Sequence, residues 1–208
     1  MSLKTILNID SVCDVLTAKG YKFFTNGDFN VNIVGVRSDT NVANSFDDNL
    51  VLFYKEGGSW NFHTFPITTD AGTYWLKNPL NNKGTAILIP NQYRSTWIID
   101  LHQGKYEALC QRKGKVKVWR DNNKDNILDF EGAVIDTGYF GINIHRSNPY
   151  TESWAVEKWS AGCQVFKKVD DFNFFMDICK KSSEKYGNSF TYTLLDENDF
   201  YETKDLIL

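Results

Sequence analysis

The residues of this chain with the clearest potential for chemistry are His145 and Cys163, which have 17 residues between them. A nucleophilic thiol needs an imidazole close in space, and a neighbouring element usually supplies it. His145 ends a strand-like run, residues 141–145, and Cys163 opens the next expected element. The pair is a candidate for acyl transfer, in which the imidazole takes the thiol proton and the thiolate attacks a carbonyl carbon. A histidine and a cysteine with purely structural roles are the alternative.

The residues around this pair offer supporting groups. Gly162 allows the backbone to turn tightly before Cys163, so the N–H groups of these two residues can face a developing oxyanion. The Ser160 hydroxyl is placed to hold that turn. No Asp or Asn close in sequence is an obvious orienting acceptor for the imidazole, and the backbone carbonyl of Arg146 is a candidate for this role.

Short β-branched or aromatic runs, separated by Gly, Asn and Asp, predict the core that positions these residues. Gly57-Gly58 and Lys113-Gly114 are expected to be hairpin tips. The sequence therefore predicts a mainly β (β + α) fold. The expected strands are residues 31–36, 50–54, 60–65, 86–89, 96–99, 106–109, 116–119, 140–144 and 190–194.

Two helices are expected to flank this core. The first spans residues 5–19 and ends before Gly20. The second follows Cys163, with Asp170 or Asp171 as its N-cap and Gly187 at its end. Apolar residues recur at helical spacing in both segments: Ile6, Val12, Val15 and Leu16 in the first, and Phe172, Phe175, Met176 and Cys179 in the second.

The 208 residues are enough for one domain with its own core, and no repeat or linker divides them. We expect an N-terminal helix in residues 1–20, a motif-bearing core in residues 30–170, and a C-terminal helix and strand in residues 170–208. A net charge of −3 argues against a general nucleic-acid binder. No apolar run is long enough to span a membrane, and we expect a monomer.

The start of the chain, residues 1–8, lacks the uninterrupted apolar segment of a secretory signal, so we expect synthesis in the cytoplasm without export by such a signal. The cysteines form no CxxC pair and have no histidine at zinc-site spacing. Besides Cys163, we expect buried free thiols at Cys13, Cys110 and Cys179, with disulfides as the alternative.

One polar segment has the spacing of a calcium-binding loop. Oxygen-bearing side chains stand at its positions 1, 3, 5 and 9, while position 6 is Asn126 rather than glycine and position 12 is Gly132 rather than glutamate. The loss of the bidentate carboxylate favours the alternative, a polar loop built on Asx turns. The candidate ligands are Asp121, Asn123, Asp125 and Asp129.

The segment from His145 to Cys163 resembles the signature of the L,D-transpeptidase catalytic-domain family. In that signature a histidine is followed, after about 14 to 17 residues, by Ser/Thr-His-Gly-Cys, a hydrophobic residue and Asn or Arg; here 14 residues lie between His145 and Ser160. The run Thr69-Asp70-Ala71-Gly72-Thr73-Tyr74 is similar to the family's upstream Thr-Pro-x-Gly-x-Phe/Tyr turn. The resemblance covers about residues 30–170. It implies a β-sandwich or open barrel, with an N-terminal helix and a helix after the cysteine.

The resemblance also implies roles. Cys163 is the expected nucleophile, His145 the base, the Arg146 carbonyl its orienting acceptor, and the N–H groups of Gly162 and Cys163 the oxyanion donors. The implied substrates are peptidoglycan stem peptides, which form a thioacyl-enzyme without a cofactor. The chain departs from the family pattern at four positions: Asp70 replaces proline, Ala161 replaces histidine, Gln164 stands at the hydrophobic position, and Val165 replaces Asn or Arg.

These departures look more like the divergent branch found in bacteriophage and related lytic proteins. We therefore expect a lytic, endolysin-like peptidase that passes the acyl group to water and acts at the bacterial wall after release or delivery. A cross-linking transpeptidase stays an alternative, as does a non-catalytic wall-binding or phage structural module. A catalytic Cys163 is expected to have a depressed pKa, which would separate an enzyme from such a module.

Further residues are candidates for substrate contact. Trp154 and Trp159 lie between His145 and Cys163, where they could form a wall of the site, although core packing is the alternative for any tryptophan. His102 follows a strand and could reach the cleft, but a turn histidine in solvent is the simpler interpretation. Arg94 could bind a stem-peptide carboxylate. The motif itself adds Gly72, Tyr74 and Ser160 to this set.

Overall fold

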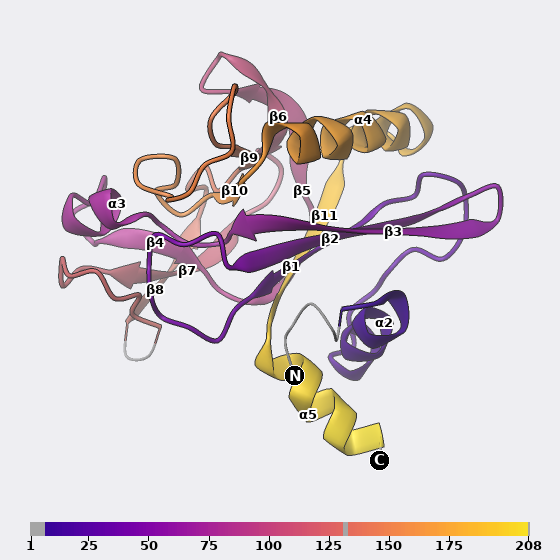
Figure 1. Ribbon diagram of the computed structural model, residues 1–208, viewed down its shortest axis with the longest axis horizontal. Coiled ribbons are helices and arrows are strands. Elements are labelled where there is room, and N and C mark those ends of the chain that lie inside the picture. Colours follow the sequence, from indigo (N-terminus) through magenta and orange to yellow (C-terminus); the bar gives the residue numbers. More distant parts are fainter. Residues whose placement is uncertain (1–6, 131–132, 208) are drawn as a thin grey trace.

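The structure is a computed structural model that describes residues 7–130 and 133–207, with the backbone alone for residues 204–207. Eight strands form a closed barrel, in which each strand pairs with its neighbours around the ring (Figure 1). The prediction of a mainly β fold is confirmed, although the ring is closed rather than open. In ring order the strands are β1 (Asn32–Arg37), β11 (Phe190–Asp196), β5 (Asn91–His102), β6 (Tyr106–Gln111), β9 (Ile144–Arg146), β10 (Gln164–Phe166), β3 (Ser59–Thr68) and β2 (Asp48–Glu56).

A second, antiparallel sheet lies beside the barrel, at the left of Figure 1. It contains β4 (Thr85–Leu88), β7 (Val116–Asp121) and β8 (Val134–Gly138), with β7 in the middle. The segments that join β4 to β5 and β6 to β7 connect this sheet to the barrel. Lys113-Gly114 is therefore not a hairpin tip as expected, because β6 and β7 belong to different sheets. Gly57 and Gly58 do form the tip between β2 and β3, with φ angles of 58° and 83°.

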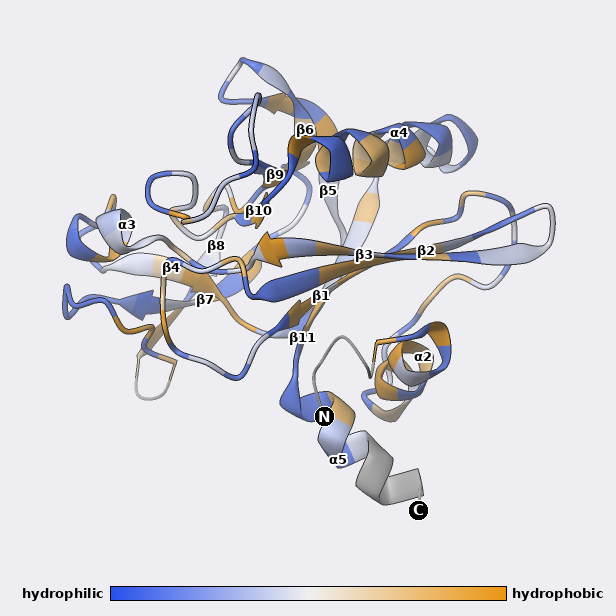
Figure 2. Ribbon diagram, in the orientation of Figure 1, coloured by the Kyte–Doolittle hydropathy of each residue, from blue (hydrophilic) through white to orange (hydrophobic). Residues whose placement is uncertain are grey.

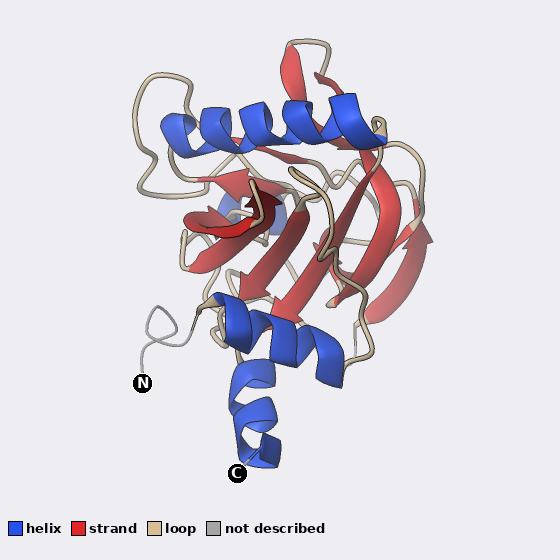
Figure 3. Cartoon of the chain, turned by 90° about the vertical axis from the view of Figure 1, so that its right-hand side faces the viewer, coloured by secondary structure: helices blue, strands red, loops and turns tan. Residues whose placement is uncertain are grey.

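Helices cover two opposite sides of the barrel (Figure 3). On one side lies α4 (Val169–Tyr186), and on the other lie α2 (Ile9–Ala18) and α5 (Asn198–Ile207). A short helix, α3 (Thr73–Lys77), sits near the small sheet. None of the helices in the described part of the chain is long and apolar enough to cross a lipid bilayer.

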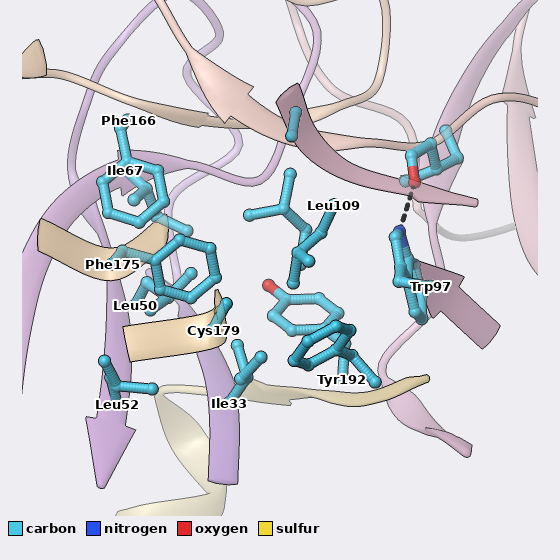
Figure 4. Close-up of a cluster of buried hydrophobic side chains, with 14 of the residues drawn as sticks. Ile33, Leu50, Leu52, Ile67, Trp97, Leu109, Phe166, Phe175, Cys179 and Tyr192 are labelled. Carbon is cyan, nitrogen blue, oxygen red and sulfur yellow. Dashed lines mark hydrogen bonds between the residues drawn. The ribbon is translucent and has the colours of Figure 1, made fainter. Parts of the chain in front are cut away.

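The apolar runs of β1 and β2 are continuous because both faces of these strands are covered. Alternate residues of the strands join two different cores, since successive side chains point to opposite faces. Ile33 and Leu52 join the barrel interior beneath α4, whereas Val34 and Phe53 pack with α2 and α5. Figure 4 shows the first core, in which Phe175 and Cys179 of α4 lie among side chains of the barrel strands.

The termini of α2 and α4 show the residue types that commonly cap helices, except at the start of α4. Asn8 and Ser11 form a capping box at the start of α2, and its hydrophobic and hydrophilic residues alternate along the ribbon in Figure 2. Gly187 ends α4 with a φ angle of 84°, as expected. The N-cap prediction for α4 is wrong: Lys168 is the N-cap, and Asp170 and Asp171 lie in the first turn, where their charge favours the helix dipole.

Most of the expected strands are present with shifted ends. The helix expected over residues 5–19 begins at Ile9, and residues 5 and 6 of that prediction lie outside the described residues. The strand expected over residues 140–144 is wrong for residues 140–143, because only Ile144–Arg146 pair with neighbours. Three short elements, α3, β8 and β10, were not expected from the sequence, and neither was α5.

Candidate functional site

Two parallel neighbours, β9 and β10, bring His145 and Cys163 to one face of the barrel wall. In their register Gln164 pairs with Ile144 and Val165 with His145. The Gln164 N–H also donates to the Asn143 carbonyl at 2.9 Å, which sets Cys163 beside Asn143. Paired residues point to the same face, and side chains two apart along a strand share it. Cys163 and His145 thus lie diagonally on one face of the barrel wall, and no hydrogen bond joins the Cys163 Sγ to the His145 ring among the described residues.

The thiol of Cys163 lies between two backbone groups. Its Sγ accepts a hydrogen bond from the Asn143 N–H at 3.4 Å and is 3.4 Å from the Gly141 carbonyl, to which it donates. Among the described residues, no hydrogen bond engages the N–H of Cys163 itself. This N–H is therefore available to a substrate oxygen.

Ser160 holds the turn before Cys163, as expected. Its Oγ donates to the Cys163 carbonyl at 2.9 Å and accepts the Gly162 N–H at 3.1 Å. Because Ser160 already accepts that N–H, the Gly162 N–H would have to leave this bond to act as an oxyanion donor, and that role stays a prediction. Gly162 also has a conformational role: its φ angle is +119°, and an added Cβ would lie 2.2 Å from the Ala86 carbonyl oxygen.

His145 is oriented by a backbone carbonyl. Its Nδ1 is 2.8 Å from the Arg146 oxygen, and the Tyr106 hydroxyl is 3.3 Å from both atoms. A carbonyl only accepts, so we assign the ring proton to Nδ1, which leaves the lone pair on Nε2. The Arg146 guanidinium in turn lies over the Tyr106 ring, 4.1 Å from its centre. These contacts fix the tautomer that a general base needs.

His102 joins the same cluster. It is buried at the end of β5, and its ring stacks on that of His145 with 4.1 Å between the ring centres. Its Nδ1 is 3.0 Å from the Asn143 side-chain amide nitrogen, while Asn143 Oδ1 accepts the Gln111 N–H at 2.9 Å. The interpretation of His102 as a turn histidine in solvent is therefore wrong.

Burial keeps both members of the pair neutral. It raises the pKa of the Cys163 thiol to about 11, the opposite of the depressed pKa expected for a catalytic cysteine. Burial, aided by the charge of nearby His102, lowers the pKa of His145 to about 3. The pKa of His102 falls to about 4, first through burial. The resting site is thus a thiol beside an imidazole rather than a thiolate–imidazolium ion pair.

This electrostatic state predicts how the free protein reacts with an alkylating agent. Modification of Cys163 by iodoacetamide should be slow at pH 7 and accelerate about tenfold per pH unit up to roughly pH 10, because the thiolate fraction rises in that proportion below the pKa. Peptide mass mapping at each pH follows Cys163 separately from the other thiols. A modification rate that is already maximal near pH 7 would contradict the buried, neutral thiol.

The two motif elements are in contact although they lie far apart in the sequence. The Gly72 N–H donates to the Ser160 carbonyl at 3.0 Å. A Cβ at Gly72 would lie 2.0 Å from the Glu157 carbonyl oxygen, so only glycine permits this approach. The indole N–H of Trp75 also donates to the Lys158 carbonyl at 3.1 Å. Residues 69–75 therefore support the segment that leads into Cys163.

A buried polar network explains one of the departures from the family pattern. Asp70, which stands in place of proline, forms an ion pair of 3.0 Å with the buried Arg37. Arg37 Nε donates to Thr69 Oγ1 at 2.9 Å, and Thr69 Oγ1 donates to Asp48 at 2.8 Å. Burial, together with the nearby Asp70 carboxyl, raises the pKa of Asp48 to about 7. The network fixes the turn before Gly72.

Gln164, a second departure, joins the same network. Its Nε2 donates to the Thr69 carbonyl at 3.3 Å, and its Oε1 accepts the Tyr192 hydroxyl at 2.8 Å. Gln164 is fully buried and directly follows Cys163. A polar residue is tolerated at this position because the barrel interior supplies both a donor and an acceptor.

Removing the donor should destabilise the fold. Tyr192→Phe leaves Gln164 Oε1 buried without this partner, so we expect unfolding free energy to fall by about 1–3 kcal/mol. Chemical denaturation measures the loss. The matched control is Tyr150→Phe, whose side chain is 88% exposed and for which we expect a change within about 0.5 kcal/mol. Equal effects of the two variants would show that the network contributes little.

The remaining candidates are partly or largely exposed to solvent. Trp154 is 81% exposed with Lys167 over its ring, and Trp159 is 41% exposed, so neither is a core residue. Tyr74 lies edge-on to Trp75 beneath the Lys158 ammonium. Arg94 is exposed on β5, and no hydrogen bond brings it to Cys163 or His145 within the described chain.

The suspected calcium loop joins β7 to β8 and is held by its own Asx turns. Asn123 Oδ1 accepts the Asp125 N–H at 3.0 Å, and Asp125 Oδ1 accepts the Ile127 N–H at 2.7 Å. Asp121 Oδ2 accepts the Asp129 N–H at 3.2 Å. Such hydrogen bonds are those expected for the alternative interpretation, a polar loop built on Asx turns. Gly132 lies outside the described residues, within which no group of three or more His, Cys, Asp or Glu side chains is placed to hold a metal ion.

Millimolar calcium is expected to leave the melting temperature unchanged within about 1 °C, because backbone N–H groups already use three of the candidate oxygens. Thermal unfolding with calcium, with magnesium and with chelator measures this. A rise of several degrees that calcium alone produces and chelator reverses would establish a site here.

Two residues of the cluster, Tyr106 and Asn143, were not among the candidates predicted from the sequence. Tyr106 and Asn143 lie beside His145 through the pairing of β6 with β9 and the path of residues 141–143. Asn143 precedes His145 by two residues, and side chains two apart in a strand point to the same face. This spacing is the one sequence feature that indicates Asn143 as a neighbour of His145.

Comparison of the chain with protein-family models, with curated proteins and with solved structures finds no match. The likeness to the L,D-transpeptidase family therefore depends on the motif residues and on the contacts that they make.

Proposed function

We propose that the protein is a cysteine acyl-transfer enzyme of L,D-transpeptidase-like fold that acts on peptidoglycan stem peptides. The observation that carries this proposal is the placement of Cys163 and His145 as neighbours on one barrel face, with the imidazole fixed by the Arg146 carbonyl. The contact between Gly72 and Ser160 adds support, because it joins the two motif elements.

In the proposed mechanism, the thiol proton passes to His145 Nε2 as Sγ attacks a substrate carbonyl carbon. The Cys163 N–H stabilises the oxyanion. The C–N bond then breaks, the imidazolium returns its proton to the departing amine, and a thioester remains on Cys163. Water, activated by the same imidazole, attacks the thioester and releases the shortened acid. The neutral resting pair is compatible with this sequence, because proton transfer accompanies attack.

One observation favours a second candidate, a non-catalytic module that keeps the fold. Burial raises the pKa of Cys163 to about 11 and lowers that of His145 to about 3, and both shifts oppose formation of the reactive ions. A wall-binding protein would have no need for a reactive thiol.

Mass spectrometry of purified muropeptides after incubation with the protein separates these candidates. The enzyme should release shortened stem peptides, and denatured protein serves as the control. Unchanged muropeptides of every wall chemistry offered, combined with binding to intact walls, would support the module instead.

A further inference from the structure

A cavity of about 250 Å³ lies between the small sheet and the two segments that border the thiol. Ala161 lines it two residues before Cys163. Phe140 lines it from the other side, next to Gly141, whose carbonyl contacts Sγ. Ala86 closes the wall where Gly162 approaches β4. The cavity thus adjoins the segments on either side of the thiol, although neither Cys163 nor His145 is among the described residues that line it.

A cation is built into this cavity. Arg120 on β7 lines it and is only 7% exposed. Its Nε and Nη2 are each 3.3 Å from Asp136 Oδ2, and its Nη1 donates to the Gly84 carbonyl at 3.2 Å. The guanidinium also lies over the Phe140 ring, 4.5 Å from its centre. These contacts hold the group firmly in place.

The anchoring contacts do not saturate Arg120. A guanidinium has five N–H donors, and these hydrogen bonds to described residues use three of them. The bonds to Asp136 are long for a charge-assisted pair, which is usually about 2.7–2.9 Å. Asp136 Oδ2 also faces the Lys83 ammonium at 3.4 Å. Two cations therefore share one carboxylate, which leaves net positive charge beside the cavity.

The size and lining of the cavity suggest what it holds. Its volume is below the range of about 300–1,000 Å³ typical of drug-sized ligands, so it suits a single small residue. Phe140, Ala86 and Ala161 give it an apolar part, whereas Asn81, Thr85 and Tyr139 add neutral polar groups. Arg120 is the one charged residue among the described residues that line it. We propose that this cavity takes a carboxylate-bearing residue of the substrate, with Arg120 as the residue that selects the carboxylate.

This inference rests on the proposed function for the link to a reaction, but its test needs no turnover. Cys163→Ala protein is titrated with acetyl-alanyl-alanine and with its C-terminal amide, each in both alanine enantiomers, and the dissociation constants are measured by calorimetry. We expect the free acid of one enantiomer to bind at least about tenfold more tightly than its amide. A tenfold ratio of dissociation constants corresponds to about 1.4 kcal/mol of binding free energy. Arg120→Gln should remove this preference.

Arg112→Gln is the matched control, since Arg112 is exposed and does not line the cavity, so its loss should leave the preference intact. Because Arg120 is buried, a second variant guards against misfolding: Asn81→Asp adds a carboxylate at the exposed rim of the cavity and should weaken binding of the acid but not of the amide. Equal binding of acid and amide to the parent protein, or equal loss in the Arg112 and Arg120 variants, would overturn the proposal. Binding that is selective for the acid, without cleavage of muropeptides, would instead support the carboxylate site and contradict the proposed enzymatic function.

Discussion

Cys163→Ala is expected to abolish release of shortened stem peptides while the protein stays folded. Cys163 supplies the atom that forms the thioester, so no other group can replace it, and the loss should be on the order of 10³-fold or more. The Cys163 side chain is small, and its Sγ makes only two sulfur hydrogen bonds of 3.4 Å, so alanine should cost little stability. Muropeptide mass spectrometry measures the activity, and thermal unfolding checks the fold.

The other cysteines provide matched controls. Cys110 and Cys179 are fully buried in the barrel core, and Cys13 lies on α2. Alanine at any of these positions should preserve the specific activity, although the two core variants should lose some stability through the cavity left behind. Full activity of the Cys163→Ala variant would end the proposed mechanism.

His145→Gln tests the base in the same assay. Glutamine can still donate to the Arg146 carbonyl but cannot take the thiol proton, so we expect a rate loss on the order of 10²-fold or more. Tyr106→Phe is a useful comparison, since it removes a neighbouring hydroxyl and keeps the imidazole. We expect it to lower the rate far less than His145→Gln, because Tyr106 only helps to position the ring.

Local sequence patterns predicted the strands that became the barrel, because β-branched runs such as residues 31–36 and 50–54 are buried on both faces. They could not predict β8, whose Val134 and Ile135 are largely exposed, or β10, which has three residues. Barrel closure depends on the parallel pairing of β1 with β11, whose residues are more than 150 positions apart in the sequence. No local signal carries such a pairing.

The candidate site also contains residues that could be predicted from the sequence and residues that could not. His145, Cys163, Ser160 and Gly72 could be found from motif spacing. The position of His102 could not be predicted, because its neighbours in sequence are typical of a turn. Only the pairing of β5 with β6 places its ring against that of His145. The raised pKa of Cys163 could not be anticipated either, because it comes from burial by residues that are distant in the sequence.

Two of the departures from the family motif bear on which acceptor takes the acyl group. Val165, at the position of Asn or Arg, is fully buried and pairs with His145 and Thr68 in the barrel wall. Ala161, at the position of histidine, lines the cavity of about 250 Å³. Neither residue offers a polar side chain to an incoming amine. Because orientation of a reactant can contribute roughly 7–11 kcal/mol to such a step, an amine that is not positioned loses most of its advantage.

Water is therefore expected to be the dominant acceptor, since it needs little positioning and can enter the cavity beside the thioester. With a stem tetrapeptide donor and excess free amine acceptor, we expect hydrolysed product to exceed amine-exchanged product by at least about tenfold, as measured by the masses of both. Ala161→His restores the imidazole of the family motif and should shift the ratio toward the amine, whereas Ala161→Ser, which fills less of the cavity, should shift it less. Predominantly cross-linked or amine-exchanged product from the parent protein would reject the lytic peptidase and favour a transpeptidase, because the thioester would then be shown to select an amine without those polar groups.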